Sequence, residues 1–565
     1  MSKINSITLE VISNGLLSIA EQMGVILTKT AYSTNIKERK DLSVAIFDAD
    51  GKVLSLAQHI PIHFSSLFGA VEEALKRWDK SEIYDGDVFI ANDPYTGGGS
   101  HLPDIALVRP VFYGGKLIAF VVNNGHHADR SRRGPTVYDE GLRIPVVKLY
   151  EKGELNRDIY DLILLNFQLK EERRGDIQAQ LITNQFGADK LIELCKKIGL
   201  ETYFEFCREW LKYGEKKARA AISALPDGEY EFEDILDDDG NGNENLKICV
   251  KLCINGDRIL FDFSGSHPQV PGPYNCVRSA LLATVYYSVK CLLDKTIPAN
   301  SGFFDSIEVK AEPGTIVCAS EPAPTFDRET TTQRLADVIF GAFAKIDPKN
   351  VIAAGCGAVT FYSIAGQDMR SGKPYVYVET IGGGNGARYN KDGLDAVQVH
   401  MTNSSNLPIE SLEMEYPLMV EEYALEEDSG GPGKYRGGLG IRRGIRILSD
   451  SENTVLAAAS TERIHTKPWG LAGGLGGATS YLDICREGKK LNEANKVRNV
   501  PLQSGDTVTL VSAGGGGYGD PQFREPERVA RDYEEGKISL ETWKAHYPSS
   551  EKTDGKKAGS ESESF

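Results

Sequence analysis

The sequence lacks any long hydrophobic run. No apolar stretch in its 565 residues comes near the roughly 18 to 20 residues that a membrane span requires. The first residues contain no apolar segment of the kind found in a signal peptide. The nine cysteines are scattered singly, without a Cys-x-x-Cys pair, which excludes a disulfide scaffold in a chain of this size. We therefore expect a cytoplasmic protein with reduced thiols and no membrane association.

Positive charge is in short supply as well. The chain has 64 lysines and arginines against 80 aspartates and glutamates, which gives a formal net charge of −16. A nucleic-acid-binding surface requires clustered basic residues, so this balance argues against such a function. A small anionic substrate is still compatible with it, because a single Arg or Lys can bind one.

Motifs for nucleotide binding and for common hydrolases are missing too. The chain has no Gly-x-x-x-x-Gly-Lys-Ser/Thr loop, no Gly-x-Ser-x-Gly elbow and no His-Glu-x-x-His helix. Gly514, Gly516 and Gly519 have the spacing of a dinucleotide-binding loop, but Asp520 and Pro521 follow directly and no βαβ unit surrounds them. We therefore expect no nucleotide site within this chain.

Hydrophobic periodicity predicts both helices and strands. Apolar residues at steps of three and four predict a helix over 8–30, and alternation on both sides of an Asp-Gly turn at 48–51 predicts a β-hairpin. Further strands are expected at 87–91 and 105–122, followed by helices over 155–225. The predicted fold class is therefore α+β (mixed α/β).

Composition divides the chain into several parts. The length allows two to four domains, and many of the 58 glycines lie after about residue 370, so the second half is expected to be glycine-rich and to contain β-structure. A break at 226–228 marks the first boundary. We predict an N-terminal α+β domain over 1–228, a central α/β domain over 229–430, a glycine-rich β domain over 431–525, and a C-terminal helix with a disordered tail over 526–565.

Three of the nine histidines lie within 27 residues of one another, close to predicted strand ends. His101 and Asp104 follow the strand at 87–91 through a glycine-rich loop, and His126 and His127 end the next hairpin. Imidazole nitrogen and carboxylate oxygen together suit Zn, Mn or Fe(II), which activate water at neutral pH. Neighbouring strand residues point to opposite faces, so only one of His126 and His127 is expected to bind a shared ion.

The spacing alone leaves a second interpretation open. His101 caps a turn in that interpretation, and His126 or His127 packs in a core. Asp41, just before the first predicted strand, is a candidate for a further carboxylate at the metal or, alternatively, a solvated loop residue.

The sequence resembles the hydantoinase B/oxoprolinase family. The resemblance extends from about residue 5 to 540, which is nearly the whole chain. It rests on Asn92-Asp-Pro-Tyr with Gly98-Gly-Ser-His101-Leu-Pro-Asp104, on Asn124-Gly-His126-His127-Ala-Asp129, on Glu171-Glu-Arg-Arg-Gly-Asp176, on Asp262-Phe-Ser-Gly-Ser266, on Ser429-Gly-Gly-Pro-Gly-Lys-Tyr-Arg-Gly-Gly438 and on Ala513-Gly-Gly-Gly-Gly-Tyr-Gly-Asp-Pro521.

The resemblance implies an enzyme made of two parts. A hydantoinase A-type subunit binds Mg-ATP and phosphorylates the carbonyl oxygen of a lactam, hydantoin or ketone, which explains the missing nucleotide motif here. The B part holds one divalent metal (Zn, Mn or Fe) on His101, Asp104 and His126, with Asp41 as an additional ligand. The expected assembly is a hetero-oligomer of two plus two subunits or larger.

The expected reaction is the opening of a hydantoin, 5-oxoproline or lactam ring by water. Asp41 or His127 takes the proton from the water molecule. Glycine loops at 382–386 and 430–438 are expected to let the backbone approach the intermediate and the A-type subunit. Two alternatives stay open, which are an ATP-dependent ketone carboxylase of the acetone or acetophenone type and a non-catalytic scaffold subunit with a structural metal.

Overall fold

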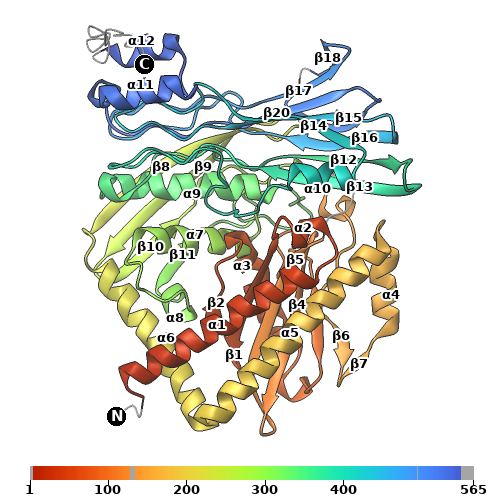
Figure 1. Cartoon of the computed structure of the whole chain (residues 1–565). Coiled ribbons are helices and arrows are strands. Elements are labelled where there is room, and N and C mark those ends of the chain that lie inside the picture. The colour runs from red at the N-terminus through yellow and green to blue at the C-terminus, as the bar shows by residue number, and fades with distance from the viewer. Residues whose placement is uncertain (1–3, 128–133, 493, 549–565) are drawn as a thin grey trace, which may run out of the picture.

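The computed structural model describes residues 4–127, 134–492 and 494–548, and helices and sheets are mixed along this whole length (Figure 1). The predicted mixed α and β fold is therefore confirmed. The predicted disordered tail after residue 548 lies outside the described residues, as do Ala128 and Asp129 of the histidine motif.

The N-terminal part is built on a seven-stranded antiparallel sheet of order β2-β1-β5-β4-β3-β6-β7. The predicted hairpins are present, and Gly114 and Gly115 make the turn between β4 and β5 with positive φ angles. In the register of that hairpin, Asp104 at the start of β4 lies opposite His126 at the end of β5. The strands are β1 (Leu42–Asp48), β2 (Val53–Leu56), β3 (Val88–Ala91), β4 (Asp104–Tyr113), β5 (Lys116–His126), β6 (Val147–Glu151) and β7 (Glu154–Leu155).

Helices cover both faces of this sheet. On one face lie α1 (Ser6–Thr30), α5 (Lys170–Ile198) and α6 (Leu200–Ile222), whose apolar side chains form one core with the sheet. By length and composition alone α1 could cross a membrane, but its apolar stripe, including Leu16 and Met23, is buried in this core. The opposite face is covered by α3 (Phe64–Arg77), which follows the short 3-10 turn η1 (Pro61–His63). Two shorter helices, α2 (Thr34–Lys37) and α4 (Arg157–Leu165), complete this part.

The central part joins the N-terminal sheet through a shared core. A four-stranded sheet of order β11-β10-β9-β8 packs with α9, and α9 contacts α7, which contacts α3. Apolar side chains from α3, α7, α9 and both sheets form one continuous cluster, so the two parts are not separated by solvent. The elements are β8 (Gly228–Asp238), β9 (Glu244–Asn255), β10 (Arg258–Asp262), α7 (Arg278–Leu292), α8 (Ser301–Phe304), β11 (Ile307–Lys310) and α9 (Arg328–Ala344).

The C-terminal half contains two antiparallel sheets that pack on one apolar core. The first has the order β13-β12-β16-β19, with β12 (Thr360–Asp368), β13 (Lys373–Ile381), β16 (Ser451–Ser460) and β19 (Lys496–Pro501). The second has the order β14-β15-β20-β17-β18, with β14 (Leu418–Leu425), β15 (Ile441–Ile447), β17 (Tyr481–Arg486), β18 (Lys489–Lys490) and β20 (Thr507–Val511). The helices of this half are α10 (Ile409–Glu415), α11 (Pro526–Glu534) and α12 (Leu540–His546).

The glycine-rich loops pack against one another. A Cβ atom on Gly384 would lie 2.0 Å from the carbonyl oxygen of Gly438, and one on Gly437 would lie 1.9 Å from that of Gly515. Backbone hydrogen bonds tie the same loops together, including Gly384 N–H to the Ala513 carbonyl. The glycines thus let three chain segments approach each other closely, and the expected approach of these loops to an intermediate and to the A-type subunit stays a prediction.

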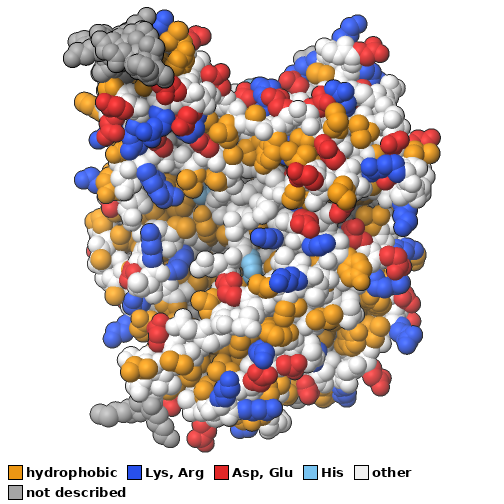
Figure 2. Space-filling model, in the orientation of Figure 1, with side chains coloured by type: hydrophobic (Ala, Val, Ile, Leu, Met, Phe, Trp, Pro, Cys, Tyr) orange, Lys and Arg blue, Asp and Glu red, His pale blue; other side chains and the backbone are white. Residues whose placement is uncertain are grey.

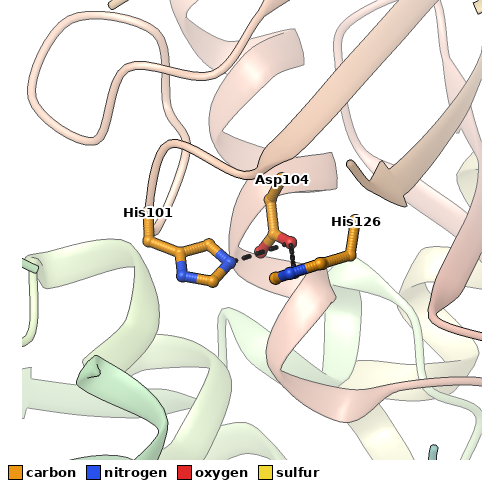
Figure 3. Close-up of side chains that lie close together, drawn as sticks. All are labelled: His101, Asp104 and His126. Atoms are coloured by element: carbon orange, nitrogen blue, oxygen red, sulfur yellow. Dashed lines mark hydrogen bonds and ion pairs between the residues drawn. The ribbon is translucent and has the colours of Figure 1, made fainter. Parts of the chain in front are cut away.

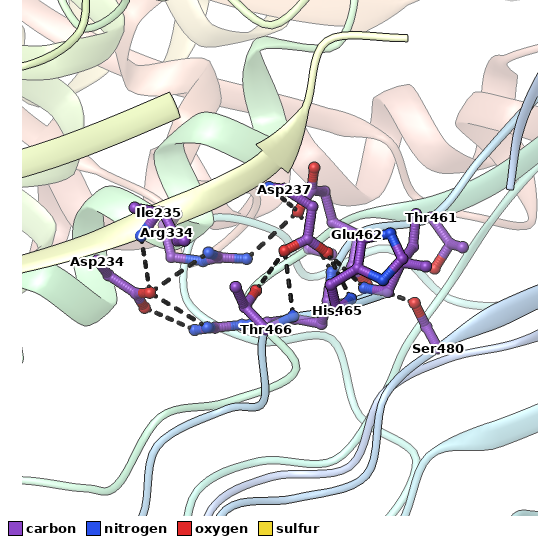
Figure 4. A network of polar contacts seen from close by, with 12 residues as sticks. Asp234, Ile235, Asp237, Arg334, Thr461, Glu462, His465, Thr466 and Ser480 are labelled. Atoms are coloured by element: carbon purple, nitrogen blue, oxygen red, sulfur yellow. Dashed lines mark hydrogen bonds and ion pairs between the residues drawn. The ribbon is translucent and has the colours of Figure 1, made fainter. Parts of the chain in front are cut away.

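A buried network of charged side chains links the central sheet to the loop after β16 (Figure 4). Arg463 donates to Asp234 on β8 at 2.9 Å, and Asp237 accepts backbone N–H groups from His465 and Thr466 at 3.0 and 3.1 Å. Such links hold segments that are more than 200 residues apart in fixed positions. The three predicted domain boundaries stay predictions, although the first coincides with the start of β8.

The outer surface mixes charges of both signs. On the face shown in Figure 2, acidic and basic side chains alternate, with hydrophobic side chains between them. This face therefore carries no broad field of a single sign.

Candidate metal centre

Three of the predicted ligands converge. The Nε2 atom of His101 lies 3.0 Å and the Nδ1 atom of His126 lies 3.2 Å from Oδ1 of Asp104, and one ligand atom from each residue lies within 4.8 Å of the others. The two imidazole rings approach the carboxylate from opposite sides (Figure 3). The β4–β5 register pairs Asp104 with His126, and the turn before β4 brings His101 to the same point.

The carboxylate of Asp104 is fully buried and surrounded by cationic or protonatable groups. Its Oδ2 accepts a hydrogen bond of 2.7 Å from the guanidinium of Arg328 at the start of α9. Burial alone would raise the pKa of Asp104, but His101, His63 and Arg328 together hold it well below its usual value. The group is therefore an ionised carboxylate, which is the form that binds a cation.

His101 is held in the orientation that a ligand requires. Its Nδ1 lies 3.1 Å from the carbonyl oxygen of Phe326, and this contact fixes which nitrogen faces Asp104. Burial, and then the charge of Arg328, lower the pKa of His101 and so favour the neutral ring. Its Nε2 is buried and, despite its closeness to Asp104, makes no hydrogen bond. An orphaned imidazole nitrogen beside an ionised carboxylate and a second histidine fits a divalent metal ion.

Sequence analysis missed His63. This residue ends η1, and its Nε2 lies 3.5 Å from Oδ1 of Asp104 and 3.3 Å from Oδ1 of Asp41. Burial would lower the pKa of His63, but the two carboxylates raise it above its usual value. No spacing pattern reveals it, because α3 brings it over the sheet from a part of the sequence without a recognisable motif.

Asp41 lies at the site but outside the group of three. Its carboxylate contacts His63, and its backbone carbonyl accepts a hydrogen bond of 3.0 Å from the N–H of His126. Asp41 therefore lies beside the converging residues, and a role as additional ligand stays a prediction.

The structure does not bring His127 into the site. Its Nε2 is 2.9 Å from the side-chain oxygen of Gln180 on α5, on the opposite face of the sheet from His126. Burial, and then the charge of Arg173, lower the pKa of His127 to about 4. His127 is thus a buried neutral residue of the helix-covered face, and Asp41 is the better placed of the two predicted bases.

A cavity of about 50 Å³ opens beside the converging residues. His101, His126, His63 and Asp41 are among its polar lining residues. Six further lining residues are apolar, and some of them belong to strands β12 and β13 of the C-terminal half; these are Ile60, Ile62, Phe326, Val359, Phe361 and Val378. The cavity can therefore take a small molecule with one polar and one apolar side.

Arg328 and Glu329 also line this cavity and form an ion pair, with 2.5 Å between Nη1 and Oε1. The guanidinium of Arg328 is therefore paired with two carboxylates, those of Asp104 and Glu329. Neither residue follows from the sequence motifs, because α9 begins more than 200 residues after Asp104.

Comparisons with known proteins agree on one family. The sequence model described as hydantoinase B/oxoprolinase matches residues 5–521. The chain is 32% identical to the caprolactamase subunit beta of Pseudomonas jessenii over 97% of this chain and 96% of that protein. The solved structure of the ATP-dependent caprolactamase from Pseudomonas jessenii matches with a TM-score of 0.89 and 30% identity, over 96% of each chain. The nucleotide-free structure of an acetone carboxylase matches with a TM-score of 0.85 and 19% identity, over 95% of this chain and 79% of that one, and shares the fold.

Proposed function

The chain belongs to the hydantoinase B/oxoprolinase family, and on that premise we propose that it is the metal-containing subunit of an ATP-dependent enzyme that opens cyclic amide rings. The observation that carries the proposal is the position of His101, Asp104 and His126 at the wall of a small, half-apolar cavity. A cyclic amide has the same two-sided character, with a polar amide bond and a hydrocarbon ring.

The proposed cofactor is one divalent ion (Zn, Mn or Fe) held by His101, Asp104 and His126. Such an ion lowers the pKa of water and polarises the bond under attack. Phe326 supports this role by fixing the ring of His101, and Arg328 keeps the carboxylate of Asp104 ionised. Both contacts are of the kind that tunes a metal ligand from outside its shell.

Asp41 is the proposed general base. It lines the cavity beside the three ligands, and its carboxylate is only slightly exposed. A carboxylate in that place can take a proton from water as the ring carbon is attacked. His63, which contacts Asp41 and Asp104, would orient both carboxylates.

The proposed partner is a hydantoinase A-type subunit that binds Mg-ATP and phosphorylates the carbonyl oxygen of the substrate. The similar caprolactamase chain of Pseudomonas jessenii is named as one subunit, and the caprolactamase of known structure from that organism is ATP-dependent by name. This sequence carries no P-loop, which is consistent with a nucleotide site elsewhere. We propose a cytoplasmic hetero-oligomer of two plus two subunits or larger, acting on a hydantoin, 5-oxoproline or lactam.

The test is ADP release by this chain co-purified with its A-type partner. The panel contains hydantoin, 5-oxoproline, caprolactam and acetone, each with and without bicarbonate. We expect turnover with a cyclic amide that does not depend on bicarbonate, and no turnover by the chain alone.

The same assay separates the alternatives. Turnover of acetone that requires bicarbonate would make the chain a ketone carboxylase subunit and would overturn the proposal. The variants His101→Ala and Asp104→Ala are expected to lose both metal and ring opening while the complex still assembles. Full activity in metal-free variants would instead make the chain a scaffold for chemistry in its partner.

A further inference from the structure

Arg39 is a buried cation without an anion. Six arginines are among the largest fully buried side chains of the described residues, with at most 1% of their surface exposed. Five of them have a carboxylate oxygen within 4.0 Å; these are Arg173, Arg328, Arg334, Arg443 and Arg463. Arg39 has no such partner anywhere in the part of the chain that the structure describes.

The contacts of Arg39 leave part of its guanidinium unused. It donates to Oδ1 of Asn35 at 2.5 Å, to the carbonyl of Val378 at 2.6 Å and to the hydroxyl of Thr380 at 2.8 Å. All three acceptors are neutral, and they use three of the five N–H groups. The Nε atom is buried and has no partner.

A buried charge in this state is costly. Removing a guanidinium from water is compensated in proteins by an ion pair or by a bound anion. The parallel N–H groups along the edge of a guanidinium match two oxygens of a phosphate or a carboxylate. The unused donors of Arg39 therefore fit an oxyanion.

Arg39 lies in the wall of the cavity that also contains His101 and His126. Asn35 fixes its position relative to these residues, because Asn35 accepts from Arg39 and donates from its Nδ2 to the carbonyl oxygen of His126 at 2.8 Å. Arg328 lines the same cavity, but Asp104 and Glu329 already neutralise it. Asp41 also lines the cavity, yet its carboxylate pairs with His63 and not with Arg39.

We propose that Arg39 binds an oxyanionic group of the substrate in this cavity. This oxyanion is one of two groups, either a phosphate placed on the substrate carbonyl or a carboxylate that the substrate itself carries. The choice between these sources rests on the proposed function, whereas oxyanion binding at Arg39 does not.

The test is the binding of inorganic phosphate and of acetate to the zinc-loaded full chain, measured by titration calorimetry. The variant Arg39→Gln keeps a side chain that can hydrogen-bond but loses the charge. We expect its dissociation constant for phosphate to rise about 10- to 100-fold, because a charge-assisted contact is lost. Zinc contributes equally to phosphate binding by the unchanged chain and by the variant, so the difference between their dissociation constants reports on Arg39.

The matched control is Arg524→Gln. Arg524 is also buried, but it pairs with Asp392 and Asp532 and lies outside the cavity. The expected dissociation constant for phosphate is unchanged in this control. The variant Arg39→Lys keeps the charge but lacks the parallel N–H donors of the guanidinium, and it is expected to bind phosphate with intermediate strength. It replaces Arg39→Gln as the test variant if Arg39→Gln does not fold.

Three outcomes would overturn the proposal. These are no phosphate or acetate binding by the unchanged chain, equal binding by Arg39→Gln, and equal loss in Arg524→Gln. If phosphate binds and acetate does not, the source is the phosphorylated carbonyl. In the assembled complex Arg39→Gln would then slow caprolactam and 5-oxoproline by similar factors, whereas a carboxylate site raises KM for 5-oxoproline alone. The binding result stands even where the complex shows no turnover, so it is separable from the proposed function.

Discussion

Glu140 should make the stability of the site fall as pH rises. This buried side chain accepts hydrogen bonds of 2.8 Å from the backbone N–H groups of Thr325 and Phe326. Burial raises the pKa of Glu140 to about 8, and those two hydrogen bonds offset it only in part. The folded chain therefore keeps a proton at neutral pH that the unfolded chain has lost.

The sign of the effect follows from proton linkage. The unfolded chain releases the proton of Glu140 as the pH rises above about 4.5, whereas the folded chain releases it only near pH 8. Stability from this group is fully present below pH 4.5 and is lost as pH rises to 8. Each pH unit inside this window lowers the free energy of unfolding by up to about 1.4 kcal/mol, so the step from pH 5.5 to 8 lowers it by about 3 kcal/mol.

The perturbation is Glu140→Gln, which has the same shape and can still accept both backbone N–H groups. We expect the unfolding free energy of the unchanged chain to fall by about 3 kcal/mol more than that of the variant between pH 5.5 and 8. In thermal unfolding this corresponds to about 3 °C of Tm for a chain of this length. Glu154→Gln, on an exposed strand end, is the control and should leave the pH slope unchanged.

The measurement is a series of Tm values by calorimetry at half-unit pH steps for the three chains. Parallel curves for the unchanged chain and Glu140→Gln would refute the reasoning, because they would mean that Glu140 is protonated to the same extent in the folded and the unfolded chain.

Three further predictions concern packing and burial. Gly384→Ala should destabilise the chain by several kcal/mol, because the added Cβ would lie 2.0 Å from the Gly438 carbonyl oxygen, whereas Gly15→Ala on α1 has room and should stabilise it by about 0.5–1 kcal/mol; denaturant midpoints of the two variants test this pair. Arg443→Gln should cost about 3–5 kcal/mol, because it leaves Glu379, 2.8 Å away, buried without its ion pair, and an unchanged Tm would contradict this estimate. Cys195, whose pKa burial raises to about 12, should resist a thiol reagent at pH 8 in the native chain and react in denaturant, as followed by mass spectrometry.

The sequence was sufficient to predict that the three proposed ligands near strand ends lie close together. His101, Asp104 and His126 stand out because histidines are rare in this chain and because a hairpin aligns its two ends. The alternation rule also separated His126 from His127 correctly. These inferences need only local geometry, which periodicity reports.

The rest of the site depends on how distant segments pack, which no local pattern reports. His63 reaches Asp104 only because α3 crosses the sheet, and Arg328 reaches it from the start of α9. The glycine loops show the same limit, since a run of glycines predicts a close backbone contact but does not identify the group that is contacted. In this structure the glycine loops contact one another.

The walls of the cavity come from three parts of the chain, and a few polar contacts hold them together. Arg39, before β1, donates to the carbonyl of Val378 on β13, so it connects the N-terminal sheet to the C-terminal half. Arg328 connects α9 to Asp104, and Glu140 holds the backbone of Phe326, whose carbonyl orients His101. Each contact fixes one wall without being a metal ligand itself. Glu140→Ala removes the acceptor of both N–H groups, so it should alter the geometry at His101 while every proposed ligand stays in the sequence, and activity would be lost through position rather than through chemistry.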